Sequence, residues 1–112
     1  MMFQKPKGTR DFYPDEKQAR HVLFDSFRSL AMRYGYGEVE TPAFEEMALL
    51  AAKSGDSIKE EIFLLEKRGA EQFGLRFDLT VPAARLYVQK QKELPKPVKW
   101  FLVDKMWRYE SP

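Results

Sequence analysis

The clearest pattern of apolar and polar positions lies near the start of the chain and predicts an amphipathic helix. Apolar side chains recur there at spacings of three and four, which places them on one helical face: Val22, Leu23, Phe27, Leu30, Ala31 and Tyr34. Pro14, followed by Asp15 and Glu16, suits a first helical turn, and Gly35 suits the left-handed residue that follows a last turn. We therefore expect a helix over about 14–34.

The next segments predict a short strand and a second helix. Two glycines flank Tyr36, an extended run follows, and Pro42 lacks the amide hydrogen that a central strand position would donate. This pattern predicts a short strand that ends at Pro42. The run 45–53 is rich in Glu, Met, Ala and Leu and is followed by Ser54 and Gly55, so we expect a shorter helix there.

The second half of the chain predicts a hairpin, a third helix and a last strand. The apolar runs 62–65 and 73–77 flank the polar segment 67–71, which is typical of an antiparallel hairpin. Thr80 is expected to cap the third helix. The final run 98–109 alternates in a way that places every second side chain on one face, which predicts a strand.

The composition is that of a globular domain and narrows the chemistry. The chain has 112 residues, 44% of them hydrophobic, which is enough to bury a core in one domain of ordinary size. It has no cysteine, which excludes a disulfide framework and a thiol nucleophile and suits a reducing cytosol. Its 19 basic and 17 acidic residues leave a net charge of +2, too small a balance to indicate a nucleic-acid partner by itself.

The two ends of the sequence bear on the localisation and the length of the protein. The N-terminal segment carries charges and prolines where a secretory signal has an apolar core, and no run approaches the roughly 20 apolar residues that span a bilayer. We therefore expect a cytoplasmic protein that does not enter a membrane. The sequence stops at Pro112, directly after a strand-like run, so we expect it to be part of a longer protein.

Asp78 and Thr80 form the first candidate site. The period of two in the strand before them places Arg76, Asp78 and, if the strand continues, Thr80 on one face, beside the start of a helix. A carboxylate with a neighbouring hydroxyl suits recognition of a cationic amino group, because the carboxylate counters the charge and the hydroxyl fills a second hydrogen-bond direction. The alternative is that both side chains only cap the following helix.

Arg108 and Glu110 form the second candidate site, again two residues apart and therefore on one face of a strand. A guanidinium there would fork onto a phosphate or carboxylate, and Glu110 would orient it or accept from an amino group. The alternative is a structural Arg–Glu pair or a solvated strand face. His21 stands without other ligands at metal spacing, so we expect no metal site in this chain.

Four segments, taken together, resemble a known family. They are 7–14 (KGTRDFYP), 34–45 (YGYGEVETPAFE), 75–85 (LRFDLTVPAAR) and 107–112 (WRYESP). In order and spacing they resemble the start of histidyl-tRNA synthetases, and the resemblance extends over nearly the whole chain. It is shared with a non-catalytic relative of that family, the regulatory subunit of ATP phosphoribosyltransferase.

The resemblance implies the α+β fold of a class II synthetase catalytic domain, in which helices lie against an antiparallel sheet. The first helix, the strand after it and Pro42 resemble motif one, which builds the dimer interface in the family. Asp78 and Thr80 would hold the amino group of the histidine substrate. Arg108 would contact the activated carboxylate and the α-phosphate of ATP, as the catalytic arginine, with Glu110 on the adenine side.

The resemblance also implies what the whole protein does and needs. Residues 1–112 would be the N-terminal portion of the catalytic domain, with motif one and the first strand of motif two and no second domain. The whole protein would use ATP and Mg²⁺ to activate histidine and transfer it to tRNA, as a homodimer. The rest of motif two, a histidine-specific insert, motif three and an anticodon-binding domain would lie beyond Pro112, so the 112 residues alone are expected to be inactive.

Two other functions fit the same residues. One is the non-catalytic regulatory subunit of ATP phosphoribosyltransferase, which would sense histidine and bind a transferase. The other is a free-standing interaction domain that uses the surface resembling motif one. Binding of ATP by the full-length protein separates the ligase from the regulatory subunit, because the regulatory subunit has no reason to retain it.

Overall fold

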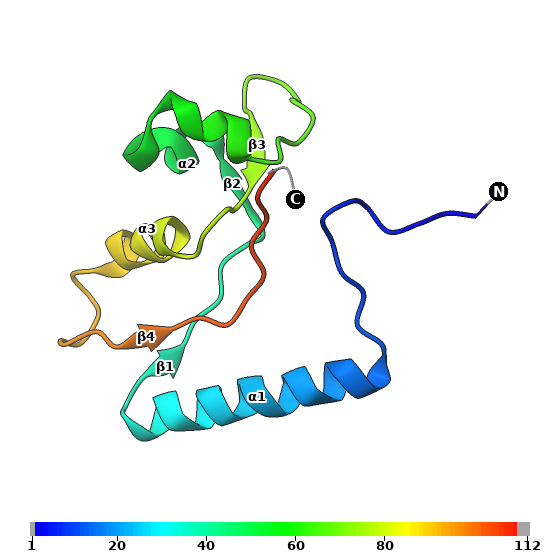
Figure 1. Ribbon diagram of the computed structural model, residues 1–112. Coiled ribbons are helices and arrows are strands. Elements are labelled where there is room, and N and C mark those ends of the chain that lie inside the picture. The colour runs from blue at the N-terminus through cyan, green and yellow to red at the C-terminus, as the bar shows by residue number, and fades with distance from the viewer. Residues whose placement is uncertain (1, 110–112) are drawn as a thin grey trace.

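The chain combines helices with short strands, which confirms the α+β class (Figure 1). The computed structural model describes residues 2–109, and of residues 53, 54 and 56 it describes only the backbone. In chain order the elements are α1 (Pro14–Arg33), β1 (Gly37–Glu38), β2 (Phe44–Glu46), α2 (Met47–Ser54), the 3₁₀ helix η1 (Asp56–Glu61), β3 (Phe73–Leu75), α3 (Thr80–Lys90) and β4 (Trp100–Phe101).

Helix α1 is the longest element and ends where the sequence predicts. Gly35 N–H donates to Met32 O at 3.0 Å, and Tyr36 N–H donates to Ala31 O at 3.1 Å. This pair of bonds is the Schellman pattern, which requires a left-handed residue after the helix, and Gly35 has a φ of +83°. The prediction of a helix that Gly35 terminates is therefore confirmed.

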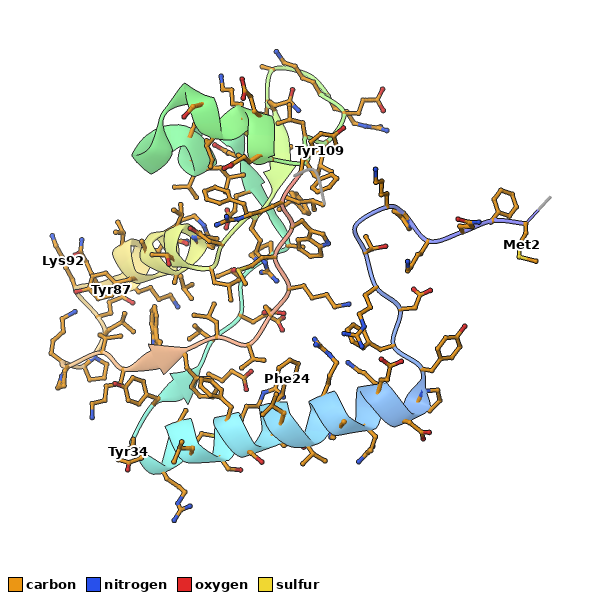
Figure 2. All side chains as sticks on the ribbon, viewed as in Figure 1. Met2, Phe24, Tyr34, Tyr87, Lys92 and Tyr109 are labelled. Atoms are coloured by element: carbon orange, nitrogen blue, oxygen red, sulfur yellow. The ribbon has the colours of Figure 1, made fainter. Side chains whose placement is uncertain are left out.

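Helix α1 lies apart from the other helices and meets the rest of the chain at β1 and β4 (Figure 1). None of its residues is buried. Phe27 packs edge-to-face against Phe101 of β4, with ring centroids 5.8 Å apart. Arg28 Nε donates to Glu38 of β1 at 3.0 Å, and this hydrogen bond raises the pKa of Arg28 above its ordinary value. Phe24 also points from α1 toward the rest of the chain (Figure 2).

The strands form two small pairs. β2 and β3 are antiparallel, as the resemblance implied, whereas β1 and β4 run parallel, with Gly37 opposite Trp100 and Glu38 opposite Phe101. Parallel neighbours need a long crossover connection. The chain between β1 and β4 supplies this connection, since it carries β2, α2, β3 and α3 before it returns (Figure 1).

The predicted helix over 45–53 begins later than expected. Glu45 and Glu46 belong to β2, and α2 starts only at Met47. Glu45 lies opposite Gly74 in the antiparallel register, and its carboxylate is buried against Arg85 of α3. Tertiary contacts therefore override the helix propensity of these two glutamates.

Strand β3 has neighbours on both sides, which explains the hairpin pattern of the sequence. One neighbour is β2. The other is the run 63–65, which pairs with β3 through an isolated bridge between Leu64 and Gly74. Leu65 N–H donates to Phe73 O, and Leu75 N–H donates to Phe63 O, both at 2.9 Å. The predicted antiparallel pairing is confirmed, although the first arm is too irregular to form a strand.

The strand predicted to end at Pro42 ends at Glu38 instead, and the strand predicted over 98–109 is much shorter than expected. β1 and β4 each have two residues. After Phe101 the chain leaves β1 and runs past Arg76 and Glu61. Trp107 N–H donates to Arg76 O at 3.0 Å, and Tyr109 N–H donates to Glu61 O at 2.8 Å. These single bonds hold an extended segment without making a regular ladder.

The hydrophobic core is small and lies where α2 packs on β3. Its buried side chains are Met47, Leu50, Ile62 and Phe77, with the partly buried Ala51 and Ile58 against them. Gly74 lets β3 approach this cluster closely, because a Cβ at that position would lie 2.6 Å from Cγ2 of Ile62. The end of β3, and with it the first candidate site, is therefore anchored directly on the core.

Candidate functional site

The segment that contains the first candidate site is a connector between β3 and α3. β3 ends at Leu75, and Leu79 has the helical backbone angles φ −104° and ψ −8°. The period of two therefore does not continue, and the prediction that Arg76, Asp78 and Thr80 share one strand face is wrong. Arg76 is buried, whereas Thr80 is exposed.

Of the two residues expected to cap the third helix, Asp78 makes a capping contact and Thr80 does not. Thr80 is the first residue of α3 rather than its cap. The N-cap residue is Leu79, whose side chain makes no capping hydrogen bond. Instead, Asp78 Oδ1 accepts a long hydrogen bond of 3.4 Å from Val81 N–H. This contact agrees with the capping alternative for Asp78, and it engages one carboxylate oxygen weakly.

The segment with Arg108 lies directly beside this connector. The bond from Trp107 N–H to Arg76 O joins the two backbones one residue before Arg108 and two residues before Asp78. Tyr109 packs edge-to-face on Phe63, with ring centroids 5.3 Å apart, and Figure 2 shows Tyr109 at the end of this segment near β3. Two candidate segments that are about 30 residues apart in the sequence are thus neighbours in space.

The side chains of the second candidate site are described in part. Arg108 is exposed. Glu110 lies outside the described residues, so its position relative to Arg108 stays a prediction. Pro42 is exposed as well, and its carbonyl accepts a hydrogen bond of 3.1 Å from Arg76.

Arg76 lies in a buried network rather than on the strand face that the sequence predicts. Only 3% of it is exposed, and its guanidinium reaches two distant segments. Nη1 donates to Thr41 O at 3.0 Å, Nε donates to Lys105 O at 2.8 Å, and Nη2 forms an ion pair with Asp104 at 3.4 Å. The signal in the sequence is weak, since an arginine just after an apolar strand looks like a solvated strand end.

A second, partly buried ion pair ties β2 to α3. Arg85 donates from Nε and Nη2 to the same carboxylate oxygen of Glu45, at 3.1 and 2.9 Å. Glu45 is only 8% exposed, so this pair fixes the side of α3 that faces the strands. In the sequence, Glu45 begins a run that favours a helix, so the pattern does not reveal this pair.

Helix α1 and the β1–β4 pair enclose an apolar hollow of about 270 Å³. It is lined by Phe27, Leu30, Ala31, Tyr34, Tyr36, Trp100 and Phe101. Several further apolar side chains of α1 are more than half exposed, among them Val22 and Leu23. A water-facing apolar surface of this kind marks an interaction site in many proteins.

The described side chains of residues 2–109 include no metal site, and the described helices include no membrane span. No group of three or more His, Cys, Asp or Glu side chains there is arranged to hold a metal ion. His21 contacts Asp25 one turn along α1, at 3.0 Å. In the same range, no helix combines the length and the apolar character that crossing a bilayer requires.

The chain is similar in sequence to known synthetases over its whole length. A family model described as histidyl-tRNA synthetase matches residues 8–111. The chain is 44% identical over 111 residues to a histidine–tRNA ligase of Haloarcula marismortui, and 43% identical over 112 residues to one of Methanococcus maripaludis. These matches cover 99% and 100% of the chain but 26% and 27% of the relatives.

Solved structures agree with these sequence matches. The crystal structure of histidyl-tRNA synthetase from Nostoc sp. PCC 7120 superposes with a TM-score of 0.86 at 33% identity, over 97% of this chain and 26% of that protein. A Bacillus halodurans structure described as an ATP phosphoribosyltransferase regulatory subunit/histidyl-tRNA synthetase superposes with a TM-score of 0.85 at 26% identity, over 99% of this chain and 29% of that one. The chain spans about a quarter of the length of its curated relatives. Since the family model covers residues 8–111 and the curated relatives align with 99% and 100% of the chain, the chain belongs to the histidyl-tRNA synthetase family.

Proposed function

We propose that the full-length gene product that contains this chain is a cytoplasmic, class II histidine–tRNA ligase. It would activate histidine with ATP and transfer the activated histidine to tRNA. The observation that carries the proposal is the backbone bond between Trp107 and Arg76, which holds the Arg108 segment beside the Asp78–Thr80 segment. Histidine and ATP must meet for activation, so their two candidate binding segments need to be neighbours.

The proposed roles follow from charge and reach. Asp78 and Thr80 hold the α-amino group of histidine, and the lightly engaged carboxylate of Asp78 supports this role. Arg108 contacts the histidine carboxylate and the α-phosphate of ATP, and offsets the negative charge that builds up between them. Glu110 lies on the adenine side of ATP.

Mg²⁺ would enter the site together with ATP and offset further charge on the phosphates. The described side chains offer no cluster of ligands for a metal ion, so we assign no Mg²⁺ ligand among them. Contacts with most of the tRNA are likewise assigned to other parts of the protein. The 112 residues alone, about a quarter of the length of the relatives, are not proposed to complete the reaction.

We also propose that the full-length protein is a homodimer through the surface that resembles motif one, which includes α1 and Pro42. The exposed apolar side chains of α1 and the hollow beside β4 support this arrangement. A second copy of the chain would cover apolar surface that is otherwise left in water.

A second candidate function is a regulatory subunit of ATP phosphoribosyltransferase that binds histidine without catalysis. The likeness to the Bacillus halodurans structure, whose description includes such a subunit, favours keeping it. The ligase is preferred because the curated relatives at 43% and 44% identity are named histidine–tRNA ligases. ATP binding by the full-length protein separates the two functions.

The proposal is tested by Arg108→Lys in the full-length gene product. Lysine keeps the positive charge but lacks the planar fork that contacts two oxygens at once. Histidine-dependent ATP–pyrophosphate exchange is expected to fall roughly 100-fold, as with the loss of other preorganised donors to transition-state charge. The melting temperature is expected to stay nearly unchanged, because Arg108 is exposed.

Arg68→Lys is the matched control, since Arg68 is also exposed and lies in the polar turn before β3. Its exchange rate is expected to equal that of the wild type. Near-normal exchange in Arg108→Lys would remove Arg108 from the ATP site. A wild-type protein that binds histidine but shows neither exchange nor ATP binding would favour the regulatory subunit.

A further inference from the structure

We propose that Arg76 is a positioning residue that sets the histidine-holding segment and the ATP-contacting segment in their relative positions. This role rests on the proposed function and adds to it a residue that would touch neither substrate. Arg76 lies two residues before Asp78. Its carbonyl accepts a hydrogen bond from the N–H of Trp107, one residue before Arg108. It is thus placed between the two halves of the proposed site.

The contacts of Arg76 join three segments that are far apart in the sequence. Its N–H donates to Ala43 O at 3.0 Å, and its Nη1 donates to Thr41 O at 3.0 Å and to Pro42 O at 3.1 Å, which ties it to the chain before β2. On the other side, Nε donates to Lys105 O at 2.8 Å. The backbone and the side chain of Arg76 therefore both bind the segment before β2 and the segment that precedes Arg108.

The burial of Arg76 makes these contacts obligatory. Arg76 is only 3% exposed. A charged group so shielded from water is costly unless ionic and hydrogen-bonding partners replace the solvent. Asp104 balances the charge at 3.4 Å, and Trp107 lies with its ring centroid 5.8 Å from the guanidinium carbon. Segment 104–107 is thus held by charge, hydrogen bonds and ring contact.

Only arginine has the shape for this task. Its guanidinium points donors in several fixed directions within one plane, so Nη1 serves residues 41–42 while Nε and Nη2 serve residues 104–105. A lysine would present one ammonium and could not span both segments. Arg76→Lys should therefore keep the charge but let the two segments shift relative to each other.

Such a shift should affect the reaction more than the binding of either substrate. Histidine would still meet Asp78 and Thr80, and ATP would still meet Arg108, because Arg76 contacts none of these side chains through its guanidinium. Their mutual orientation would change, and a displacement of about 1 Å can cost roughly 100-fold in rate. A fall in kcat with nearly constant KM values is the expected signature.

The experiment measures ATP–pyrophosphate exchange by the full-length gene product, with active sites titrated so that unfolded protein is not counted. Arg76→Lys is expected to lower kcat about 30- to 100-fold and to change the KM of histidine and of ATP less than about 3-fold. Arg85→Lys is the matched control, because Arg85 is also in a shielded ion pair but joins only α3 to β2. Its kcat is expected to stay within about 2-fold of the wild type.

A second variant and a second readout guard against simple misfolding. Asp104→Asn removes the counter-charge of Arg76 but keeps an oxygen that can accept from Nη2, at a side chain that is 28% exposed. It should lower kcat about 3- to 10-fold while most of the protein stays folded. The ¹⁹F resonance of 5-fluorotryptophan at position 107, identified by its loss in Trp107→Phe, should move in both variants. It should not move in Arg85→Lys.

The outcomes separate the inference from the proposed function. Normal kcat in Arg76→Lys, in a wild-type background that performs the exchange, would overturn the role of Arg76 and leave the ligase proposal standing. An unmoved ¹⁹F resonance would overturn it as well. A wild-type protein without histidine-dependent exchange would overturn both, whereas rises confined to the two KM values would show that Arg76 serves binding rather than placement.

Discussion

At the scale of single residues, two tasks compete for Asp78. Its Oδ1 accepts a long bond from Val81 N–H at the start of α3, which is a capping contact. Its charge and its position beside the Arg108 segment also suit the amino group of histidine. Because a cap needs only an acceptor oxygen while an ammonium prefers a negative charge, one substitution can separate the two tasks.

Asp78→Asn keeps a capping oxygen and removes the charge, since asparagine caps helices about as well as aspartate. In the full-length gene product we expect the KM of histidine to rise roughly 10- to 100-fold, the equivalent of a lost charge-assisted hydrogen bond. ATP binding and the melting temperature should change little. Steady-state exchange kinetics and thermal unfolding measure these quantities, and an unchanged histidine KM would leave Asp78 with the capping role alone.

At the scale of elements, the fit of β3 against α2 depends on a position without a side chain. A Cβ on Gly74 would lie 2.6 Å from Ile62 Cγ2 and 3.3 Å from Met47 Sδ. Both neighbours are buried in the core cluster and have little room to move. This contact matters for the site, because the connector with Arg76 and Asp78 begins where β3 ends.

Gly74→Ala should therefore strain the core. We expect a loss of about 1–3 kcal/mol in the free energy of unfolding, the usual cost of overpacking a well-filled interior. Gly37→Ala is the control, because a Cβ there would meet nothing within 4 Å. Thermal unfolding of the two variants, followed by circular dichroism, measures the difference. Equal melting temperatures would show that β3 shifts freely to make room.

At the scale of the whole molecule, the chain is more extended than its length requires. Its radius of gyration is 17.0 Å, whereas a compact domain of this length has a radius of about 13 Å. Helix α1 and the N-terminal segment lie away from the core around α2 (Figure 1). Apolar surface on α1 consequently faces water, which the proposed homodimer would cover.

We expect Leu30→Asp to weaken self-association of the full-length gene product. Leu30 is 52% exposed and lines the hollow between α1 and β4, so a charge there would have to be buried when two copies meet. The dimer dissociation constant should rise about 30-fold or more, as for a well-packed interface residue. Gln18→Asp, an equal change of charge at another exposed position of α1, should leave it unchanged.

Sedimentation at a series of concentrations measures both variants and the wild type. A wild-type protein that stays monomeric at high concentration would contradict the proposed homodimer. Equal dissociation constants for Leu30→Asp and the wild type would place the interface elsewhere on the molecule.

The sequence by itself determined the features that depend on near neighbours along the chain. Helix α1, its end at Gly35 and the start of α3 near Thr80 follow from patterns within a few residues, because helical hydrogen bonds and caps join positions three or four apart. The four motif-like segments likewise identified the family, which the sequence matches confirm. The roles of Asp78, Thr80, Arg108, Glu110 and Pro42 stay predictions.

Only the tertiary structure decided the features that depend on distant partners. Glu45 joins a strand because Gly74 and Arg85 lie beside it, and β4 stops at Phe101 because the chain then leaves β1 for the neighbourhood of Arg76. Strand length and the burial of a charge are set by which segments meet, and those contacts are non-local. Arg76 therefore looks like a solvated strand end in the sequence, and becomes the centre of a buried network only when residues 41–42 and 104–105 close around it.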